Sequence, residues 1–127
     1  MNSGLNFLYV GLGGAIGACL RYSVSLVLSG YVVRFPLATF SVNVAGALLA
    51  GLLATWFWQR GLIGTPLQLL TIVGVLGGFT TFSAFSVETL RLFEAGELAL
   101  AAGNVLVNVI GSLLGVLAGA YLARTIA

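Results

Sequence analysis

The chain has 127 residues, of which 60% are hydrophobic and only 6% are charged, and its mean hydropathy is +1.14. A soluble domain carries about 25% charged residues, so five arginines and three glutamates cannot keep a globule of this size in water. The composition therefore predicts an integral membrane protein, and the length predicts a single domain over residues 1–127. Nucleic acid is excluded as a partner, because the sequence has no basic run or basic–aromatic patch.

Four apolar segments are long enough to cross a membrane, which takes roughly 20 residues each. The connectors between them contain glycine, proline or charged residues, and the segments cover residues 5–28, 37–58, 67–93 and 98–123. The sequence thus predicts an all-α fold of four transmembrane helices, with both termini on the same side of the membrane. The chain does not open with the basic region and cleavage site of a signal peptide, so we expect the first segment to be retained.

The first segment combines small residues with one arginine. Gly13 and Gly17 form a GxxxG pattern, which lets helix backbones approach closely in lipid. The pattern predicts tight helix packing, with an oligomer as a further expectation. We interpret Cys19, which has no cysteine partner, as a small packing residue. Arg21 is a charged group within an apolar segment, and such groups point to a functional interior.

The second segment carries one side-chain amide, Asn43, near its start. The amide offers two donors and an acceptor oxygen. Leaving such a group unpaired within hydrocarbon is costly. Asn43 is therefore a candidate site residue.

The third segment contains a glycine pair, Gly77 and Gly78, close to its middle. Glycine is favoured just past a helix C-terminus, and Thr80 or Thr81 would then cap a second half-helix. A broken helix is tolerated at this depth only where it is buried in protein or lines a cavity, and its freed carbonyls can bind Na⁺. The alternative is a glycine kink that only eases packing.

Aromatic and hydroxyl side chains alternate directly after this break. Phe82 and Phe85 lie three residues apart on one helical face, and Ser83 and Ser86 lie on a neighbouring face. Phenylalanines at this spacing are usually lipid-facing or part of a core. Beside a break, their positive ring edges could also solvate a small anion weakly enough for it to leave.

A glutamate closes the third segment. Glu88 lies within i,i+3 reach of Arg91, so the plain interpretation is a local ion pair near the membrane interface. Glu94 and Glu97 flank a connector, and we expect both to be solvated.

The fourth segment carries a polar stripe. Asn104, Asn108 and Ser112 follow one another at intervals of four residues, which places them on one face over about 12 Å. A single asparagine could merely join two helices, whereas an aligned stripe is better explained as the lining of a wet path. The segment also repeats the close-packing pattern at Gly111, Gly115 and Gly119.

The arginines favour neither direction of insertion. Arg60 and Arg124 fall on one face of the membrane, and Arg34 and Arg91 fall on the other, with Arg21 nearer the second face. Orientation normally follows an excess of basic residues in cytoplasmic connectors. The simplest interpretation is dual topology, in which the chain inserts both ways and pairs antiparallel. Misplaced segment ends are the alternative.

The chain lacks the groups that catalysis requires. It has no histidine, one cysteine and no pair of carboxylates within its apolar segments, so acid–base, nucleophilic and side-chain metal chemistry lack their parts. An enzyme is not expected, and a passive path for a species that accepts hydrogen bonds remains. A small dual-topology exporter of cationic drugs driven by protons would need a carboxylate in the first segment. A structural subunit of a membrane complex would need neither a broken helix nor a polar stripe.

Three stretches together resemble the CrcB/Fluc family of fluoride channels. They are GGAIGACLRY at 13–22, PLATFSVNVAG at 36–46 and GVLGGFTTFSAFSVET at 74–89, and the resemblance covers the full chain length. It implies an antiparallel, dual-topology homodimer in the plasma membrane, with two pores that pass fluoride down its gradient and so protect the cytoplasm. The orientation-neutral arginines agree with this.

The resemblance also implies roles for individual residues. It implies a structural Na⁺ held by main-chain carbonyls, at Gly77 and Thr80 by motif position. It places Phe82 and Phe85 on the anion path, Asn43 in the pore, Arg21 in a vestibule and Ser112 in a polar track. Ser83 and Asn108 join these as pore candidates from the pattern of hydroxyls and amides, and Thr81 and Glu88 are possible supports of the pore helix. Where relatives often carry a hydroxyl one turn after Ser112, this chain has Val116, and Asn104 and Asn108 also replace other residues.

Overall fold

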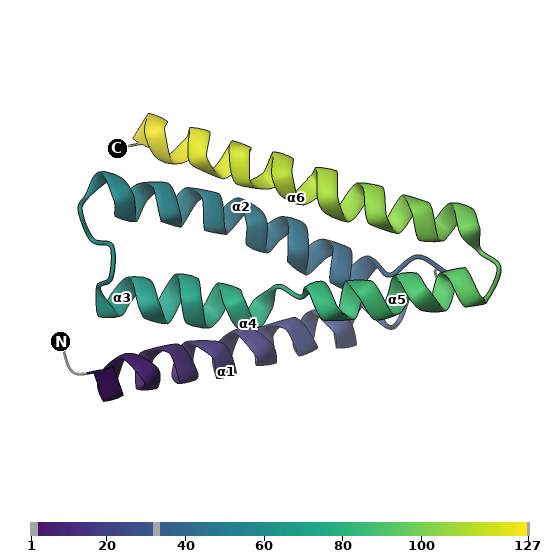
Figure 1. Ribbon diagram of the computed structural model, residues 1–127, viewed down its shortest axis with the longest axis horizontal. Coiled ribbons are helices and arrows are strands. Elements are labelled where there is room, and N and C mark those ends of the chain that lie inside the picture. The colour runs from purple at the N-terminus through teal and green to yellow at the C-terminus, as the bar shows by residue number, and fades with distance from the viewer. Residues whose placement is uncertain (1–2, 32–33, 127) are drawn as a thin grey trace.

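The computed structural model describes residues 3–31 and 34–126, and it contains four helical spans long and apolar enough to cross a membrane. The first, second and fourth spans are single helices: α1 (Ser3–Leu28), α2 (Leu37–Gln59) and α6 (Leu98–Ile126). The third span, Pro66–Glu94, is made of several pieces. All four predicted spans are confirmed, with ends within three residues of those expected. The described ends of the chain lie at the same end of the bundle (Figure 1).

The third span is broken, as predicted. It consists of α3 (Pro66–Gln68), the π-helix η1 (Leu69–Leu76), the short α4 (Gly77–Phe79) and α5 (Phe82–Glu94). Thr80 and Thr81 between α4 and α5 are extended, with ψ of 156° and 117°. The break lies about midway along the bundle (Figure 1).

The position of the break corrects one expectation. The glycine pair does not end the helix, because Gly77 and Gly78 are themselves helical and form α4. A Cβ on Gly78 would meet the Gly14 carbonyl of α1. The glycine at 78 therefore serves a close helix contact, and the two threonines that follow form the break.

The GxxxG glycines pack helices within the chain. A Cβ on Gly13 would meet the backbone of η1 at Leu70, and a Cβ on Gly119 would meet the Leu48 carbonyl of α2. The predicted close packing is confirmed. These glycine faces are covered inside one chain, so they do not themselves indicate an oligomer.

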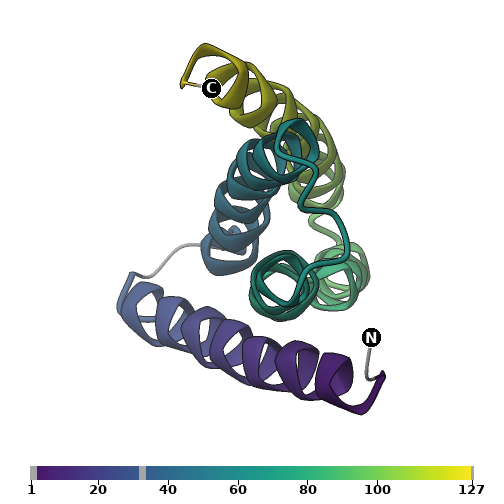
Figure 2. The ribbon, with the colours of Figure 1, turned by 90° about the vertical axis from the view of Figure 1, so that its left-hand side faces the viewer.

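The four spans form an open arrangement. In the end view α1 lies at one edge and α6 at the opposite side, with the third span and α2 between them (Figure 2). α1 packs against η1 and α4, and α6 packs along α2 and against α5. The buried core is small, and many large apolar side chains face outward, as a surrounding of lipid allows. Cys19 is exposed on α1, so within one chain it is not a packing residue.

Candidate functional site

The break in the third span is held by a side chain from α2. The Oδ1 atom of Asn43 accepts a hydrogen bond of 2.8 Å from the Thr81 N–H, and its Nδ2 donates to the Thr81 carbonyl at 3.0 Å. The amide thus pairs with both backbone groups of an extended residue that has left its helix. Buried backbone groups need such partners, so Asn43 stabilises the break.

The two threonines of the break have different tasks. The Thr81 hydroxyl caps α5 by accepting a hydrogen bond of 3.1 Å from the Ala84 N–H. The Thr80 hydroxyl instead turns back and donates to the Leu76 carbonyl at 2.9 Å. Of the two predicted caps, Thr81 is therefore the one that the structure uses.

Two main-chain carbonyls at the break lose their ordinary helical donors. In an unbroken helix the Gly77 carbonyl would accept from the Thr81 N–H, which here bonds to Asn43. The Thr80 carbonyl would likewise accept from the Ala84 N–H, which here bonds to the Thr81 hydroxyl. These are the two carbonyls that the family resemblance assigns to a cation by motif position.

The arginine of α1 meets the same break from the other side. The Nε atom of Arg21 donates to the Gly78 carbonyl at 3.1 Å. A cation at a helix C-terminus is favourable, because the last carbonyls carry partial negative charge. Arg21 therefore binds the end of the first half-helix, a role that the sequence did not reveal.

The polar stripe of α6 is part of a hydrogen-bonded chain. Asn43 Nδ2 donates to Asn108 Oδ1 at 3.1 Å, Asn108 Nδ2 donates to Asn104 Oδ1 at 2.8 Å, and Asn104 Nδ2 donates to the Thr89 hydroxyl at 2.9 Å. Thr89 then donates to the Phe85 carbonyl at 2.8 Å. Asn104 is 0% exposed and Asn108 is 4% exposed. Within one chain, these two asparagines join α2, α5 and α6.

A groove opens at the break, and Asn43, the first amide of this chain, is part of its wall. Its volume is about 410 Å³, and its wall combines residues of α2, the third span and α6. The hydroxyl of Ser112 makes no hydrogen bond with any residue of the described ranges, so it is a free donor at the groove. The groove collects six of the predicted site residues: Asn43, Gly77, Thr80, Thr81, Phe82 and Ser112.

Residues 8–120 match the sequence profile of the family described as CrcB-like protein, Camphor Resistance (CrcB). The chain belongs to the CrcB family. It is 48% identical over 118 residues to the fluoride-specific ion channel FluC of Paracoccus denitrificans, covering 93% of this chain and 94% of the relative.

Other relatives carry similar names. The chain is 40% identical over 121 residues to the fluoride-specific ion channel FluC 2 of Nitrobacter hamburgensis, covering 94% of this chain and 98% of the relative. It is 38% identical over 128 residues to the fluoride-specific ion channel FluC of Ruminiclostridium cellulolyticum, covering 100% of this chain and 98% of the relative. The resemblance noted in the sequence is thus confirmed along nearly the whole chain.

The phenylalanine pair of this CrcB chain is divided between two environments. Phe82 is 76% exposed and lies at the groove, whereas Phe85 is 6% exposed and packs inside. Their ring centroids are 5.2 Å apart and the rings are tilted by 59°. Ser83 is exposed beside them, with its hydroxyl 3.3 Å from that of Thr81. Of the two phenylalanine rings, that of Phe82 lines the groove and that of Phe85 does not.

Glu88 has a different partner from the one expected. Its Oε1 atom accepts a hydrogen bond of 2.7 Å from the Thr39 hydroxyl, and its buried Oε2 atom has no hydrogen-bond partner within the described ranges. The expected ion pair with Arg91 is wrong, since the ion pair found among the described residues joins Arg34 and Glu97 at 2.8 Å.

Sequence reasoning missed two threonines that the site uses. Thr39 binds Glu88, and Thr89 joins Asn104 to α5. Each lies one helical turn from a residue that had been singled out, Asn43 and Phe85 respectively. That spacing was the available signal, because residues four apart share a helix face.

Proposed function

We propose that this CrcB chain forms a passive, fluoride-selective channel in the plasma membrane. Its relatives named fluoride-specific ion channels support the choice of anion. The observation that carries the proposal is the groove at the break, where an apolar membrane bundle brings polar side chains together and leaves the Ser112 hydroxyl free. Fluoride is small and strongly hydrated, so its water can be replaced only by good hydrogen-bond donors.

The groove offers donors without a fixed charge. Ser112 contributes a free hydroxyl. Asn43 and Thr81 also line the groove, but both Nδ2 hydrogens of Asn43 are already donated to the Thr81 carbonyl and to Asn108, and the Thr81 hydroxyl caps α5. The arginine of the break, Arg21, is engaged with the Gly78 carbonyl of α4 and does not line the groove. Conduction requires binding that is strong enough for entry and weak enough for exit. Neutral donors meet that requirement, with the edge of the Phe82 ring as a further weak contact.

Selectivity against chloride follows from the same donors. Chloride is larger and accepts hydrogen bonds less strongly, so closely spaced hydroxyls and amides compensate poorly for its lost water. The described first span, Ser3–Leu28, contains no acidic residue, which a proton-driven exporter would need there. In this proposal the chain is a channel without a catalytic step.

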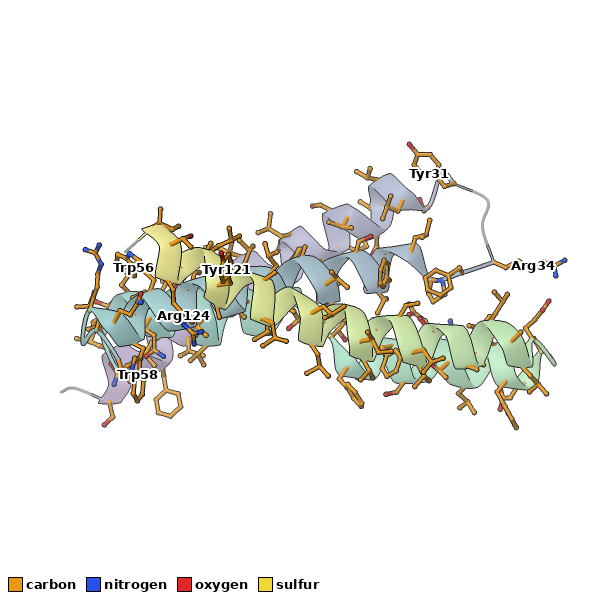
Figure 3. All side chains as sticks on the ribbon, turned by 90° about the horizontal axis from the view of Figure 1, so that it is seen from above. Tyr31, Arg34, Trp56, Trp58, Tyr121 and Arg124 are labelled. Atoms are coloured by element: carbon orange, nitrogen blue, oxygen red, sulfur yellow. The ribbon has the colours of Figure 1, made fainter. Side chains whose placement is uncertain are left out.

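An antiparallel homodimer completes the path in this proposal. One chain leaves the groove open to its surroundings and Phe82 76% exposed. A second copy related by a two-fold axis presents the same surface, so two grooves would be closed at once. The even distribution of arginines supports opposite insertion of the two copies, with Arg34 and Arg124 at opposite ends of the bundle (Figure 3).

The carbonyls at the break fit a structural Na⁺. Hard cations of this kind prefer oxygen ligands, and unwound carbonyls at half-helix ends supply them. The Gly77 and Thr80 carbonyls have both lost their helical donors. No group of three His, Cys, Asp or Glu side chains that could hold a metal is found among the described residues. A bound Na⁺ would supply positive charge that holds the two breaks of the dimer together.

The function can be tested in cells that lack fluoride export. Expression of this chain should restore growth on fluoride-containing medium and lower the fluoride content of the cytoplasm. An expressed, membrane-inserted chain that leaves both unchanged would contradict the proposal.

A further inference from the structure

One end of the bundle carries positive charge without nearby acidic residues. Arg60 follows the last turn of α2, and Arg124 lies in the last turn of α6. All three glutamates of the chain fall within residues 88–97, at the opposite end of the bundle (Figure 1). There Arg34 has a carboxylate partner, Glu97, at 2.8 Å. Arg60 and Arg124 have no such partner among the described residues.

A hollow lies between the two helix ends that carry these arginines. Its volume is about 480 Å³, and it is lined by Ala54, Thr55, Trp58 and Gln59 of α2 and by Arg124 of α6. The side chains of Thr55, Gln59 and Arg124 make no hydrogen bond or ion pair with any described residue. Three kinds of hydrogen-bond donor therefore line one hollow with their donors free.

Three backbone acceptors at the end of α2 are already occupied. The last carbonyls of α2 accept hydrogen bonds from the connector that follows: Trp56 from the Arg60 N–H at 3.2 Å, Phe57 from the Leu62 N–H at 2.9 Å and Trp58 from the Gly61 N–H at 3.1 Å. The free donors of the hollow therefore remain available to an acceptor from outside the chain. Arg60 itself lies over the Trp56 ring, 4.8 Å from its centroid.

Aromatic side chains place this end at the membrane surface. Trp58 is 76% exposed and Tyr121 is 66% exposed, and they lie with Trp56 and Arg124 at one end of the bundle (Figure 3). Tryptophan and tyrosine are enriched at the level of lipid head groups. The hollow therefore lies where phosphodiesters are concentrated.

We propose that this hollow binds the phosphodiester of an anionic phospholipid. Arg124 supplies the charge and a guanidinium that suits phosphate oxygens, and Thr55 and Gln59 supply neutral donors. Ala54 and Trp58 offer apolar surface to the glycerol and the upper acyl chain. Basic pockets between transmembrane helices bind such head groups in other membrane proteins. The absence of a nearby carboxylate in the described chain favours an anionic lipid over a zwitterionic one, whose cation would have no partner there.

The test is a lipid titration of the purified full-length chain in detergent, followed by native mass spectrometry. Phosphatidylglycerol is compared with phosphatidylcholine of the same acyl chains. Arg124→Gln should weaken phosphatidylglycerol binding by about fivefold, the effect of one arginine near a charged lipid surface. Gln59→Leu keeps the net charge and should also weaken it. Binding of phosphatidylcholine should be the same for all variants.

Arg34→Gln is the matched control, because it removes the same charge from the opposite end. It should leave phosphatidylglycerol binding unchanged. Equal losses in Arg124→Gln and Arg34→Gln would overturn the proposal, since they would show attraction by net charge alone. Unchanged binding in Arg124→Gln would also overturn it. Inorganic phosphate should not displace the lipid, and displacement would show a site for free phosphate instead.

Discussion

At the scale of single residues, Asn43 of α2 joins the break in the third span to the fourth helix, α6. Its amide bonds both backbone groups of Thr81 and the side chain of Asn108. Each of these groups lies in a bundle with an apolar exterior, where an unpaired polar group is expensive. Asn43 therefore holds the break open and fixes the start of the buried amide chain.

Replacement of Asn43 by leucine should damage stability and transport together. The change leaves the N–H and carbonyl of Thr81 without partners, and each buried unsatisfied group costs about 1–3 kcal/mol. We expect a lower melting temperature in detergent and a fluoride efflux rate reduced by at least about tenfold, the equivalent of about 1.4 kcal/mol. Asn6→Leu makes the same chemical change in α1 away from the break. Similar behaviour of the two variants would contradict the role of Asn43.

The two phenylalanines should respond differently to substitution by isoleucine. Phe85→Ile alters a packed interior, where changes of shape cost about 1–3 kcal/mol, so melting temperature and fluoride efflux should both fall. Phe82→Ile alters an exposed ring, so efflux should fall while melting changes little. Efflux and melting of both variants are measured on the same preparations. If efflux is intact in both variants, the phenylalanines do not face the anion.

At the scale of elements, the third span shows what the sequence could and could not reveal. Its length, its break and its threonine cap were predictable from apolar runs and from capping chemistry. The place of the break was not, because Gly78 is held in the helix by contact with Gly14 of α1. A glycine that permits close approach and a glycine that ends a helix look alike until the neighbouring helix is known.

The contact at Gly78 gives a prediction for this element. A Cβ there would lie 2.5 Å from the Gly14 carbonyl and 3.0 Å from the Ala18 nitrogen. Gly78→Ala should push α4 away from α1 and strain the Arg21–Gly78 bond, with a cost of about 1–3 kcal/mol. Gly103→Ala in α6 meets nothing within 4 Å and should be neutral or stabilising, by up to about 1 kcal/mol. A lower melting temperature for Gly78→Ala than for Gly103→Ala supports this packing, and the reverse order contradicts it.

The fourth helix shows the same limit for polar residues. The sequence placed Asn104, Asn108 and Ser112 on one face, and the structure agrees with that alignment. The sequence could not show that Asn104 donates a hydrogen bond to Thr89 and that Asn108 accepts one from Asn43. Partners from other helices thus decide whether a polar stripe is a buried network or a surface open to an ion. Among the described residues of the groove wall, Ser112 alone retains a free hydroxyl.

At the scale of the whole molecule, the two ends of the bundle carry equal numbers of arginines in connectors and helix ends. Arg124 and Arg34 lie at opposite ends (Figure 3). Arg60 follows the end of α2, and Arg91 lies in the last turn of α5. Basic residues in short connectors set orientation, whereas acidic residues contribute little. The arginines of the connectors and helix ends therefore favour neither direction, which supports the proposed dual topology.

This balance predicts how orientation can be changed. A reporter fused to the C-terminus should show the unmodified chain in both orientations. Ile63, which is 53% exposed in the α2–α3 connector, can be replaced to add a basic residue at one end. Ile63→Arg should shift the population toward the form with that end in the cytoplasm, and Ile63→Gln should not. A single orientation of the unmodified chain would contradict dual topology.

The central claim is that this CrcB chain conducts fluoride and excludes chloride. The most direct measurement is ion efflux from liposomes that contain the purified protein, recorded with fluoride and chloride electrodes under matched gradients. The account predicts rapid fluoride efflux and chloride efflux no greater than that of protein-free liposomes. Fluoride efflux at the protein-free level, or chloride efflux as fast as that of fluoride, would contradict it.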